Sequence, residues 1–213
     1  MKNVVLCDFD GTITSMDSCE IVLNRFAKGE WERYDEQLLR GGISLEECMR
    51  KQFQMIKASR AMILHVLENY IFFRPNLKEL VNYCRVKHIP FIIVSGGLDF
   101  VVRHFLKKNE LDNYVEVVAA KTKFIEDNIE LEYPKKLFDN SVDFKEDLVK
   151  KYKNEGFRVI FIGDGLSDFQ AVGKADFIFV VADSRLAAKC REERIQHEEF
   201  ADFSQVAQRI SSW

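Results

Sequence analysis

Four short runs of apolar residues divide the chain, and each ends in polar or glycine-rich residues. The runs are VVLC (4–7), FIIV (91–94), VIFI (159–162) and FIFVVA (177–182). Short, continuous, β-branched-rich runs are typical of strands buried on both faces. Helical patterns separate them, so the alternation predicts an α/β fold in which helices flank a parallel sheet. Two further extended segments, 115–120 and 129–134, flank a polar turn at Asp127 and Asn128 and predict a β-hairpin.

Several helices carry recognisable start signals. Pro75 precedes the helical stretch NLKELVNYCRVK, which predicts a proline in the first turn. Ser44 with Glu47, and Asp143 with Glu146, have the spacing of a capping box ahead of a helix. These signals predict helices that begin near residues 45, 76 and 144.

The segment after the first strand follows a different pattern. It contains helical spacings such as Met49, Phe53 and Ile56, and it contains no convincing strand. We therefore expect a small helical insertion on the α/β core. The predicted domains are a core, 1–13 and 76–213, and a helical cap, 14–75.

Composition narrows the class of protein. The 213 residues include 31 Lys and Arg against 34 Asp and Glu, a formal charge of −3, and 47% are hydrophobic. This is a globular composition, and its charge balance argues against a nucleic-acid partner or a membrane partner. The chain contains no run of about 18 apolar residues. Five widely spaced cysteines without a CxxC pair argue against a disulfide framework, so we expect a cytoplasmic protein; the oligomeric state stays open.

Acidic residues follow the first and third of the four runs. Asp8 and Asp10 are two residues apart, so in an extended chain their carboxylates would point the same way. Asp164 follows the third run, and Asp168 lies four residues later, about one turn into a helix. The carboxyl ends of parallel strands share one edge of a sheet, so Asp8, Asp10 and Asp164 are expected to converge there. Clustered carboxylates need a cation, and Mg²⁺ suits oxygen ligands best.

The second run ends in Ser95-Gly96-Gly97 and leads into a helical stretch. A hydroxyl, free backbone N–H groups and a helix N-terminus together can bind an anion. Lys145 lies in the first turn of the helix before the third run, where a cation is unfavourable unless an anion is nearby. Acids with a cation and an anion site are typical of phosphoryl transfer.

The strings DFDGT, SGG, Lys145 and GDGLSD, in this order, resemble the four motifs of the haloacid dehalogenase-like phosphatases. The resemblance covers nearly the whole chain and implies a Rossmann-like core. The helical insertion resembles the cap of the phosphoserine phosphatase-like branch. Within it, the chain looks closest to phosphoserine phosphatase and to the methionine-salvage enzyme 2-hydroxy-3-keto-5-methylthiopentenyl-1-phosphate phosphatase.

The resemblance also implies roles for individual residues. Asp8 resembles the nucleophile that becomes an aspartyl phosphate, and Asp10 resembles the general acid and base. Magnesium would be held by the carboxylates of Asp8 and Asp164 and by the backbone carbonyl of Asp10, with Asp168 as acidic support. The residues implied to bind phosphate or to fix its loop are Thr12, Ser95, Gly96 and Lys145.

Substrate choice is expected to lie in the cap. Asp17 stands where phosphoserine phosphatases carry an acidic residue for the substrate amine, although it could instead cap the first helix of the insertion. Their arginine for the substrate carboxylate aligns with Gln52, and Arg50 is two residues away. The cysteine-rich stretch of many methionine-salvage phosphatases is replaced here by LEYPKKLFDNSVDFK. The sequence therefore predicts a small phosphorylated metabolite as the substrate.

Other functions use related residues. A phosphotransferase would form the same aspartyl phosphate and pass it to an alcohol, which the sequence does not separate from hydrolysis. A phospho-receiver module is usually about half this length, and its acidic pair precedes a separate acceptor aspartate, whereas here the acceptor-like residue is Asp8 itself. An EF-hand is excluded because its later acidic positions are missing after DFDGT.

Overall fold

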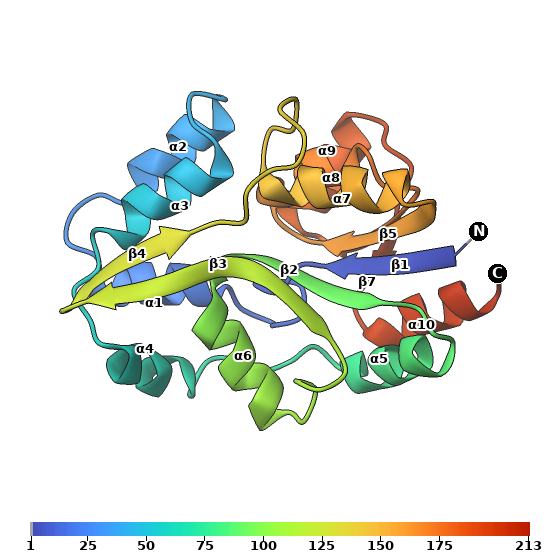
Figure 1. The fold of residues 1–213 in the computed structure, drawn as a ribbon, viewed down its shortest axis with the longest axis horizontal. Coiled ribbons are helices and arrows are strands. Elements are labelled where there is room, and N and C mark those ends of the chain that lie inside the picture. The colour runs from blue at the N-terminus through green and yellow to red at the C-terminus, as the bar shows by residue number, and fades with distance from the viewer. Residues whose placement is uncertain (1) are drawn as a thin grey trace.

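A seven-stranded sheet forms the centre of the molecule (Figure 1). The structure, a computed structural model, describes residues 2–213. The strand order is β4-β3-β2-β1-β5-β6-β7, and every neighbouring pair is parallel except β3 and β4. The strands are β1 (Lys2–Cys7), β2 (Phe91–Leu98), β3 (Glu116–Ile125), β4 (Asn128–Glu132), β5 (Phe157–Gly163), β6 (Phe177–Val181) and β7 (Glu198–Phe200). The predicted α/β fold and hairpin are confirmed; β7 was not predicted.

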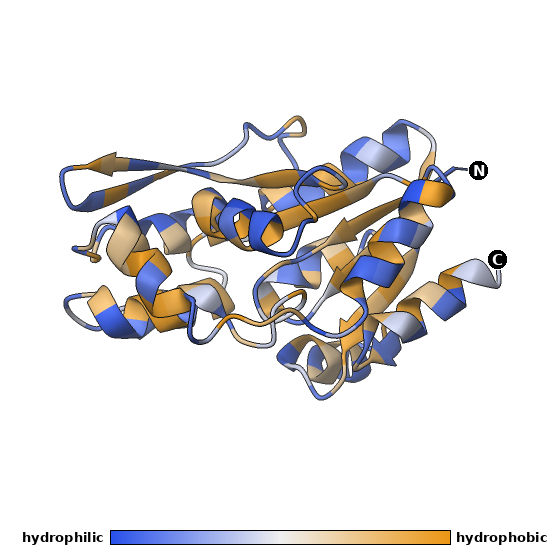
Figure 2. Cartoon of the chain, turned by 90° about the horizontal axis from the view of Figure 1, so that it is seen from below, coloured by the Kyte–Doolittle hydropathy of each residue, from blue (hydrophilic) through white to orange (hydrophobic). Residues whose placement is uncertain are grey.

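Helices cover both faces of this sheet. In Figure 1, α7, α8 and α9 lie on one side of the strands, and α5, α6 and α10 lie on the other. Figure 2 shows hydrophobic residues concentrated along the strands between these layers. The helices of the two layers are α5 (Leu77–Val86), α6 (Asp99–Lys108), α7 (Phe144–Asn154), α8 (Phe169–Val172), α9 (Arg185–Glu192) and α10 (Phe203–Ser211), with a 3₁₀ turn η1 (Leu166–Asp168) before α8.

Four helices lie between β1 and α5. They are α1 (Ser18–Phe26), α2 (Glu32–Leu39), α3 (Leu45–Phe53) and α4 (Arg60–Leu67). The ends of this insertion meet, because Thr14 and Phe73 form an isolated antiparallel bridge. The β3–β4 hairpin extends beyond the parallel strands and lies beside α3 (Figure 1). Apolar side chains of the insertion and of the sheet belong to one continuous core.

The helix starts agree only in part with their predicted signals. The Ser44 and Asp143 side chains accept hydrogen bonds from the N–H groups of Glu47 and Glu146, at 3.2 and 2.8 Å. The reciprocal half of each predicted capping box is replaced, because Glu47 pairs with Lys51 and Glu146 accepts from the N–H of Val142. The first-turn position predicted for Pro75 was wrong. Asn76, with a left-handed φ of 63°, comes between Pro75 and the first residue of α5.

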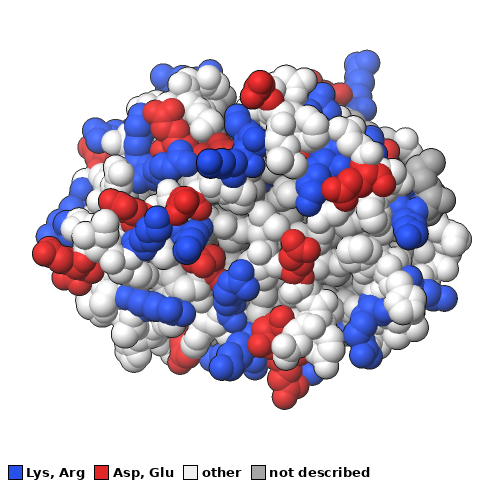
Figure 3. Space-filling model, viewed as in Figure 1, with Lys and Arg blue, Asp and Glu red and all other residues white. Residues whose placement is uncertain are grey.

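Charged side chains of both signs are interspersed on the surface. Figure 3 shows basic and acidic residues side by side on the face viewed in Figure 1. This arrangement agrees with the small net charge of −3.

Candidate active site

The first two site residues lie at the carboxyl edge of the central strands. Asp8 directly follows β1, and Asp164 directly follows β5. These strands are parallel neighbours in which Cys7 is paired with Ile162, and the Asp8 N–H donates to the carbonyl of Ile162 at 2.9 Å. The sheet register therefore brings together two aspartates from distant parts of the sequence.

Lys145 joins Asp8 to Asp168. Its Nζ atom lies 2.7 Å from Asp8 Oδ1 and 2.6 Å from Asp168 Oδ1, and all three residues are buried. Burial alone would lower the pKa of Lys145, but Asp168 and Asp8 outweigh it and raise that pKa above its ordinary value. Lys145 therefore carries a fixed positive charge between two carboxylates.

Asp168 also organises the loop around it. Its Oδ2 atom accepts hydrogen bonds from the N–H groups of Asp164 and Gly165, both at 3.2 Å. A Cβ atom on Gly163 would lie only 2.5 Å from the same oxygen, so glycine is required there. Asp168 thus fixes both Lys145 and the backbone that presents Asp164.

Thr12 and Gly11 hold Asp164 from the other side. The Thr12 hydroxyl donates to Asp164 Oδ1 at 2.7 Å. Gly11 has a φ of +74°, and a Cβ atom there would lie 2.3 Å from Asp164 Oδ2. Burial and the nearby charge of Asp168 raise the pKa of Asp164 to about 7. The predicted phosphate role of Thr12 stays a prediction, since its hydroxyl points to Asp164 here.

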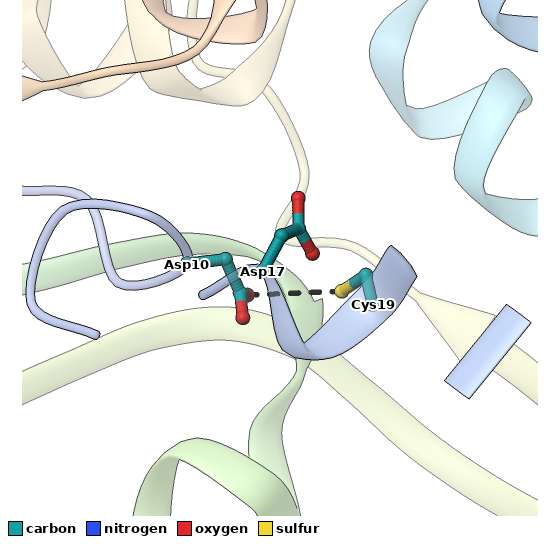
Figure 4. A group of neighbouring side chains, drawn as sticks. All are labelled: Asp10, Asp17 and Cys19. Carbon is teal, nitrogen blue, oxygen red and sulfur yellow. Dashed lines mark hydrogen bonds between the residues drawn. The ribbon is translucent and has the colours of Figure 1, made fainter. Parts of the chain in front are cut away.

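The Asp10 carboxylate belongs to a second group. Its Oδ1 atom accepts from the Ser18 N–H at 2.8 Å, and its Oδ2 atom faces the Cys19 thiol at 3.7 Å, as Figure 4 shows. Burial raises the pKa of Asp10 above its ordinary value. β1 ends at Cys7 and the chain turns at Asp10, and the two carboxylates have different hydrogen-bond partners. That Asp8 and Asp10 point the same way stays a prediction.

Asp17 lies beside Asp10 and caps a helix. Its Oδ1 atom accepts from the N–H of Glu20 at 3.0 Å, at the start of α1. Desolvation by the surrounding protein and the charge of Asp10 raise the pKa of Asp17 to about 7, although the residue keeps solvent contact. The prediction that Asp17 caps the first helix of the insertion is confirmed by this hydrogen bond. A contact between Asp17 and substrate stays a prediction.

The Ser95-Gly96-Gly97 segment lies against the Asp10 group. The Ser95 hydroxyl oxygen accepts from the Gly97 N–H at 3.0 Å. A Cβ atom on Gly97 would lie 2.6 Å from Cys19 Sγ and 2.9 Å from Asp10 Oδ2. The glycine therefore permits close approach of this strand end to Asp10, and β2 continues through the segment to Leu98.

Two residues that the sequence did not single out hold the backbone of the predicted motifs. Arg74 donates to the carbonyls of Gly11 and Thr12 at 2.9 and 3.0 Å. The Tyr133 hydroxyl donates to the carbonyl of Gly96 at 2.6 Å. Both contacts join residues far apart in the chain, and no local pattern marks them.

The predicted substrate residues of α3 have other partners. Arg50 Nε donates to the carbonyl of Leu131 at 3.2 Å, and its guanidinium lies 5.2 Å from the centre of the Tyr133 ring. Gln52 is buried, and its amide nitrogen lies 2.7 Å from Asp35 Oδ1. The hydrogen bonds of Gln52 thus stay within the helical insertion, and none joins it to the Asp8 group.

The donor set around Asp8 fits a hard cation. Carboxylate oxygens of Asp8, Asp164 and Asp168 lie within 4.8 Å of one another, whereas Lys145 supplies one positive charge among them. Among residues 2–213, Lys145 makes the one hydrogen bond to the Asp8 carboxylate, and it reaches Oδ1 and not Oδ2. Three carboxylates, one of which keeps a free oxygen, beside a single ammonium group are suited to an oxygen-seeking divalent ion.

Comparisons with known proteins agree with this arrangement. A family model described as haloacid dehalogenase-like hydrolase matches residues 5–172. The 2-hydroxy-3-keto-5-methylthiopentenyl-1-phosphate phosphatase of Brevibacillus brevis is 33% identical over 210 residues, which cover 96% of this chain and 93% of that protein. The enzyme of the same name from Geobacillus kaustophilus is 31% identical over 209 residues, which cover 95% and 93%.

Solved structures share the fold. A substrate-bound phosphoserine phosphatase complex superposes with a TM-score of 0.73 at 18% identity, covering 98% of both chains. A phosphoserine phosphatase from T. onnurineus gives a TM-score of 0.70 at 20% identity, covering 99% of this chain and 94% of the other. Within residues 2–213, no helix combines the length and apolar character needed to cross a membrane. The family match and the sequence relatives show that this chain belongs to the haloacid dehalogenase-like hydrolases.

Proposed function

We propose that this chain is a phosphatase that hydrolyses 2-hydroxy-3-keto-5-methylthiopentenyl-1-phosphate through an aspartyl phosphate at Asp8. The class, a phosphoric monoester hydrolase, follows from the family and from relatives that match almost the whole chain. One observation carries the role of Asp8: Lys145 holds its Oδ1 atom at 2.7 Å, and this is the one hydrogen bond to the Asp8 carboxylate from residues 2–213.

The proposed reaction has two steps. An oxygen of Asp8 attacks phosphorus and forms an aspartyl phosphate, while the bond from phosphorus to the leaving oxygen breaks and Asp10 gives that oxygen a proton. Asp10 then takes a proton from a water molecule, whose oxygen attacks phosphorus and releases Asp8 and inorganic phosphate. Burial raises the pKa of Asp10, and this direction supports the role because it favours the protonated form that a general acid needs.

Charge neutralisation completes the site. Mg²⁺ would be held by the carboxylates of Asp8 and Asp164 and by the backbone carbonyl of Asp10, and would supply positive charge to the phosphoryl oxygens. Lys145, Ser95 and the backbone of Gly96 bind the remaining phosphoryl oxygens. Asp168 supports the ligands by fixing Lys145 and the Asp164 backbone.

Contacts in α3 favour the methionine-salvage substrate over phosphoserine. Gln52 is committed to Asp35, and Arg50 is directed toward Leu131 and Tyr133. A phosphoserine carboxylate would need a free cation at this position. The four helices between β1 and α5 support 14–75 as a cap on a core of 1–13 and 76–213. A cytoplasmic location stays a prediction from the five cysteines, all buried and free.

Phosphate release from a panel of phosphomonoesters tests the proposal. The panel holds the methionine-salvage ester, phosphoserine, sugar phosphates and nucleotides, each with magnesium or with EDTA. We expect magnesium-dependent turnover, greatest with the methionine-salvage ester, that is lost in Asp8→Asn and kept in the exposed control Asp112→Asn. Greater turnover of phosphoserine than of the methionine-salvage ester would overturn the proposed substrate assignment. Turnover in Asp8→Asn would overturn the proposed mechanism. Phosphate transfer to added alcohol in place of release would indicate a phosphotransferase.

A further inference from the structure

We propose that Glu46 is a positioning residue that fixes the N-terminus of α7 and thereby sets Lys145 for phosphoryl transfer. This inference rests on the proposed function, because Lys145 matters only if Asp8 reacts. Glu46 belongs to the helical insertion, and none of the sequence motifs includes it. Its carboxylate is buried, and Oε1 accepts a hydrogen bond from the backbone N–H of Phe144 at 2.8 Å.

This contact satisfies a helix terminus that the local sequence leaves incomplete. The first N–H groups of a helix have no partner within the helix. At α7, the Asp143 side chain accepts from the N–H of Glu146 at 2.8 Å, which leaves the N–H of Phe144 to be satisfied elsewhere. Glu46 supplies the acceptor from 98 residues earlier in the chain. A carboxylate there also interacts favourably with the positive end of the helix dipole.

The residue after Phe144 is the fixed cation of the site. Lys145 places its Nζ atom 2.7 Å from Asp8 and 2.6 Å from Asp168, and the residue is 1% exposed. A side chain held this tightly by both ends transmits a shift of its backbone to its ammonium group. Glu46 therefore controls where the positive charge meets Asp8.

Helix α3, which carries Glu46, also contacts the Gly96 segment of the proposed phosphate site. Leu45 Cδ2 lies 3.8 Å from the position of a Cβ atom built on Gly96. Arg50 lies over the Tyr133 ring, and the Tyr133 hydroxyl holds the Gly96 carbonyl at 2.6 Å. Helix α3 thus spans the two elements that present Lys145 and Gly96. Displacing α3 disturbs both elements at once, which couples the insertion to the reacting groups.

Variants at residue 46 test the role of this carboxylate. Glu46→Ala removes the acceptor, Glu46→Gln keeps an acceptor of the same size, and Glu47→Ala is the matched control, because Glu47 is the next residue and pairs with Lys51 outside the site. We expect kcat to fall about 10- to 100-fold in Glu46→Ala, with KM changed less than about threefold, because reacting groups are displaced while substrate contacts remain. Glu46→Gln should retain most of the turnover, and Glu47→Ala should match the wild type.

Amide hydrogen exchange provides the second readout. We expect faster exchange in the first turn of α7 in Glu46→Ala, with unchanged protection in β1 and β5, whereas a general loss of stability would raise exchange throughout. If Glu46→Ala does not fold, the inference is judged on Glu46→Gln and Glu46→Asp, and the shorter side chain should lose more turnover. Wild-type kcat in Glu46→Ala, or a reduced kcat with unchanged exchange in α7, would overturn the inference. A wild-type enzyme without any phosphatase activity would instead overturn the proposed function, and the exchange measurement would still test the Glu46–Phe144 contact.

Discussion

At the scale of single residues, the site depends on one buried ammonium group shared by two buried carboxylates. Lys145 contacts Asp8 and Asp168, while Thr12 holds Asp164. A buried charge without a partner is costly, so these contacts stabilise the folded chain and also hold the reacting carboxylates in place. The sequence predicted Lys145 from its position at a helix start. It did not predict that Lys145 contacts Asp168 directly, since no local pattern encodes that distance.

Removing the ammonium group should therefore affect both stability and activity. We expect Lys145→Met to lower the free energy of unfolding by about 3–5 kcal/mol in EDTA, because Asp8 and Asp168 lose their partner. Turnover should be abolished. Urea unfolding and phosphate release measure the two effects, and Lys150→Met serves as a control whose partner Glu146 keeps other contacts. A change below about 1 kcal/mol, the range of surface pairs, would contradict this reading.

Gly11 and Gly41 form a natural comparison for backbone strain. Both have positive φ angles, +74° and +70°, but a Cβ atom on Gly11 would strike Asp164, whereas one on Gly41 would meet no atom within 4 Å. Gly41→Ala should cost about 1–2 kcal/mol from conformation alone and leave turnover unchanged. Gly11→Ala should cost more and also weaken magnesium dependence through Asp164. Equal effects of the two variants in unfolding and metal titrations would refute the close contact.

At the scale of elements, hydrophobic runs predicted strands well where burial is complete. The runs at 4–7, 91–94 and 159–162 became β1, β2 and β5. The short strand β7 was not predicted, because Glu198–Phe200 contains two charged residues and one apolar residue. Strand alternation does not extend to Asp8 and Asp10, because alternation holds only inside a strand and β1 ends at Cys7. Contacts of α3 with α7 and β4 were unpredictable, since they depend on tertiary packing.

Gln52 has two possible roles, packing within the insertion or binding of substrate, and a variant distinguishes them. It joins α3 to α2 through Asp35, and it is buried. We expect Gln52→Ala to lower the free energy of unfolding by about 1–3 kcal/mol, because the Asp35 carboxylate loses its amide donor and keeps only the weaker thiol donor of Cys48. The KM for the preferred substrate should change less than about twofold, as kinetics on the purified variant would report. A large rise in KM with wild-type stability would restore Gln52 as a substrate residue.

At the scale of the whole molecule, the helical insertion and the sheet share one hydrophobic core. The site is built from residues that are far apart in the sequence. Apolar residues of α1, α3 and α4 belong to the same core as the strands. The places of Asp8 and Asp164 at the ends of predicted strands predicted that they converge at the carboxyl edge, because a parallel sheet brings its strand ends together. The Arg74, Tyr133 and Glu46 contacts that stabilise the edge could not be predicted, since each joins residues that only the fold brings together.

Packing several carboxylates together makes stability depend on pH and on metal. The pKa of Asp164 is about 7 in the folded chain, above the ordinary value of about 4 for an unfolded aspartate. Between these values the folded state binds the extra proton, so the contribution of Asp164 to stability is present below about pH 4 and is lost as pH rises toward 7. Bound magnesium should offset this loss.

We therefore expect magnesium to raise Tm more at about pH 8 than at about pH 5, where Asp164 still holds its proton in the folded chain. Thermal unfolding in magnesium or EDTA measures the difference, and Asp164→Asn should abolish most of it. An equal rise of Tm at both pH values would show that Asp164 is not the linked group.

Trapping the intermediate tests the central claim most directly. The wild-type enzyme is mixed with the methionine-salvage ester and magnesium, quenched in acid within the first turnover, and digested for mass spectrometry. The proposed mechanism predicts one added phosphoryl group on the peptide that contains Asp8, located on Asp8 by fragmentation and absent from Asp8→Asn. A phosphoryl group on another residue, or turnover with no phosphorylated peptide at any quench time, would contradict Asp8 as the nucleophile.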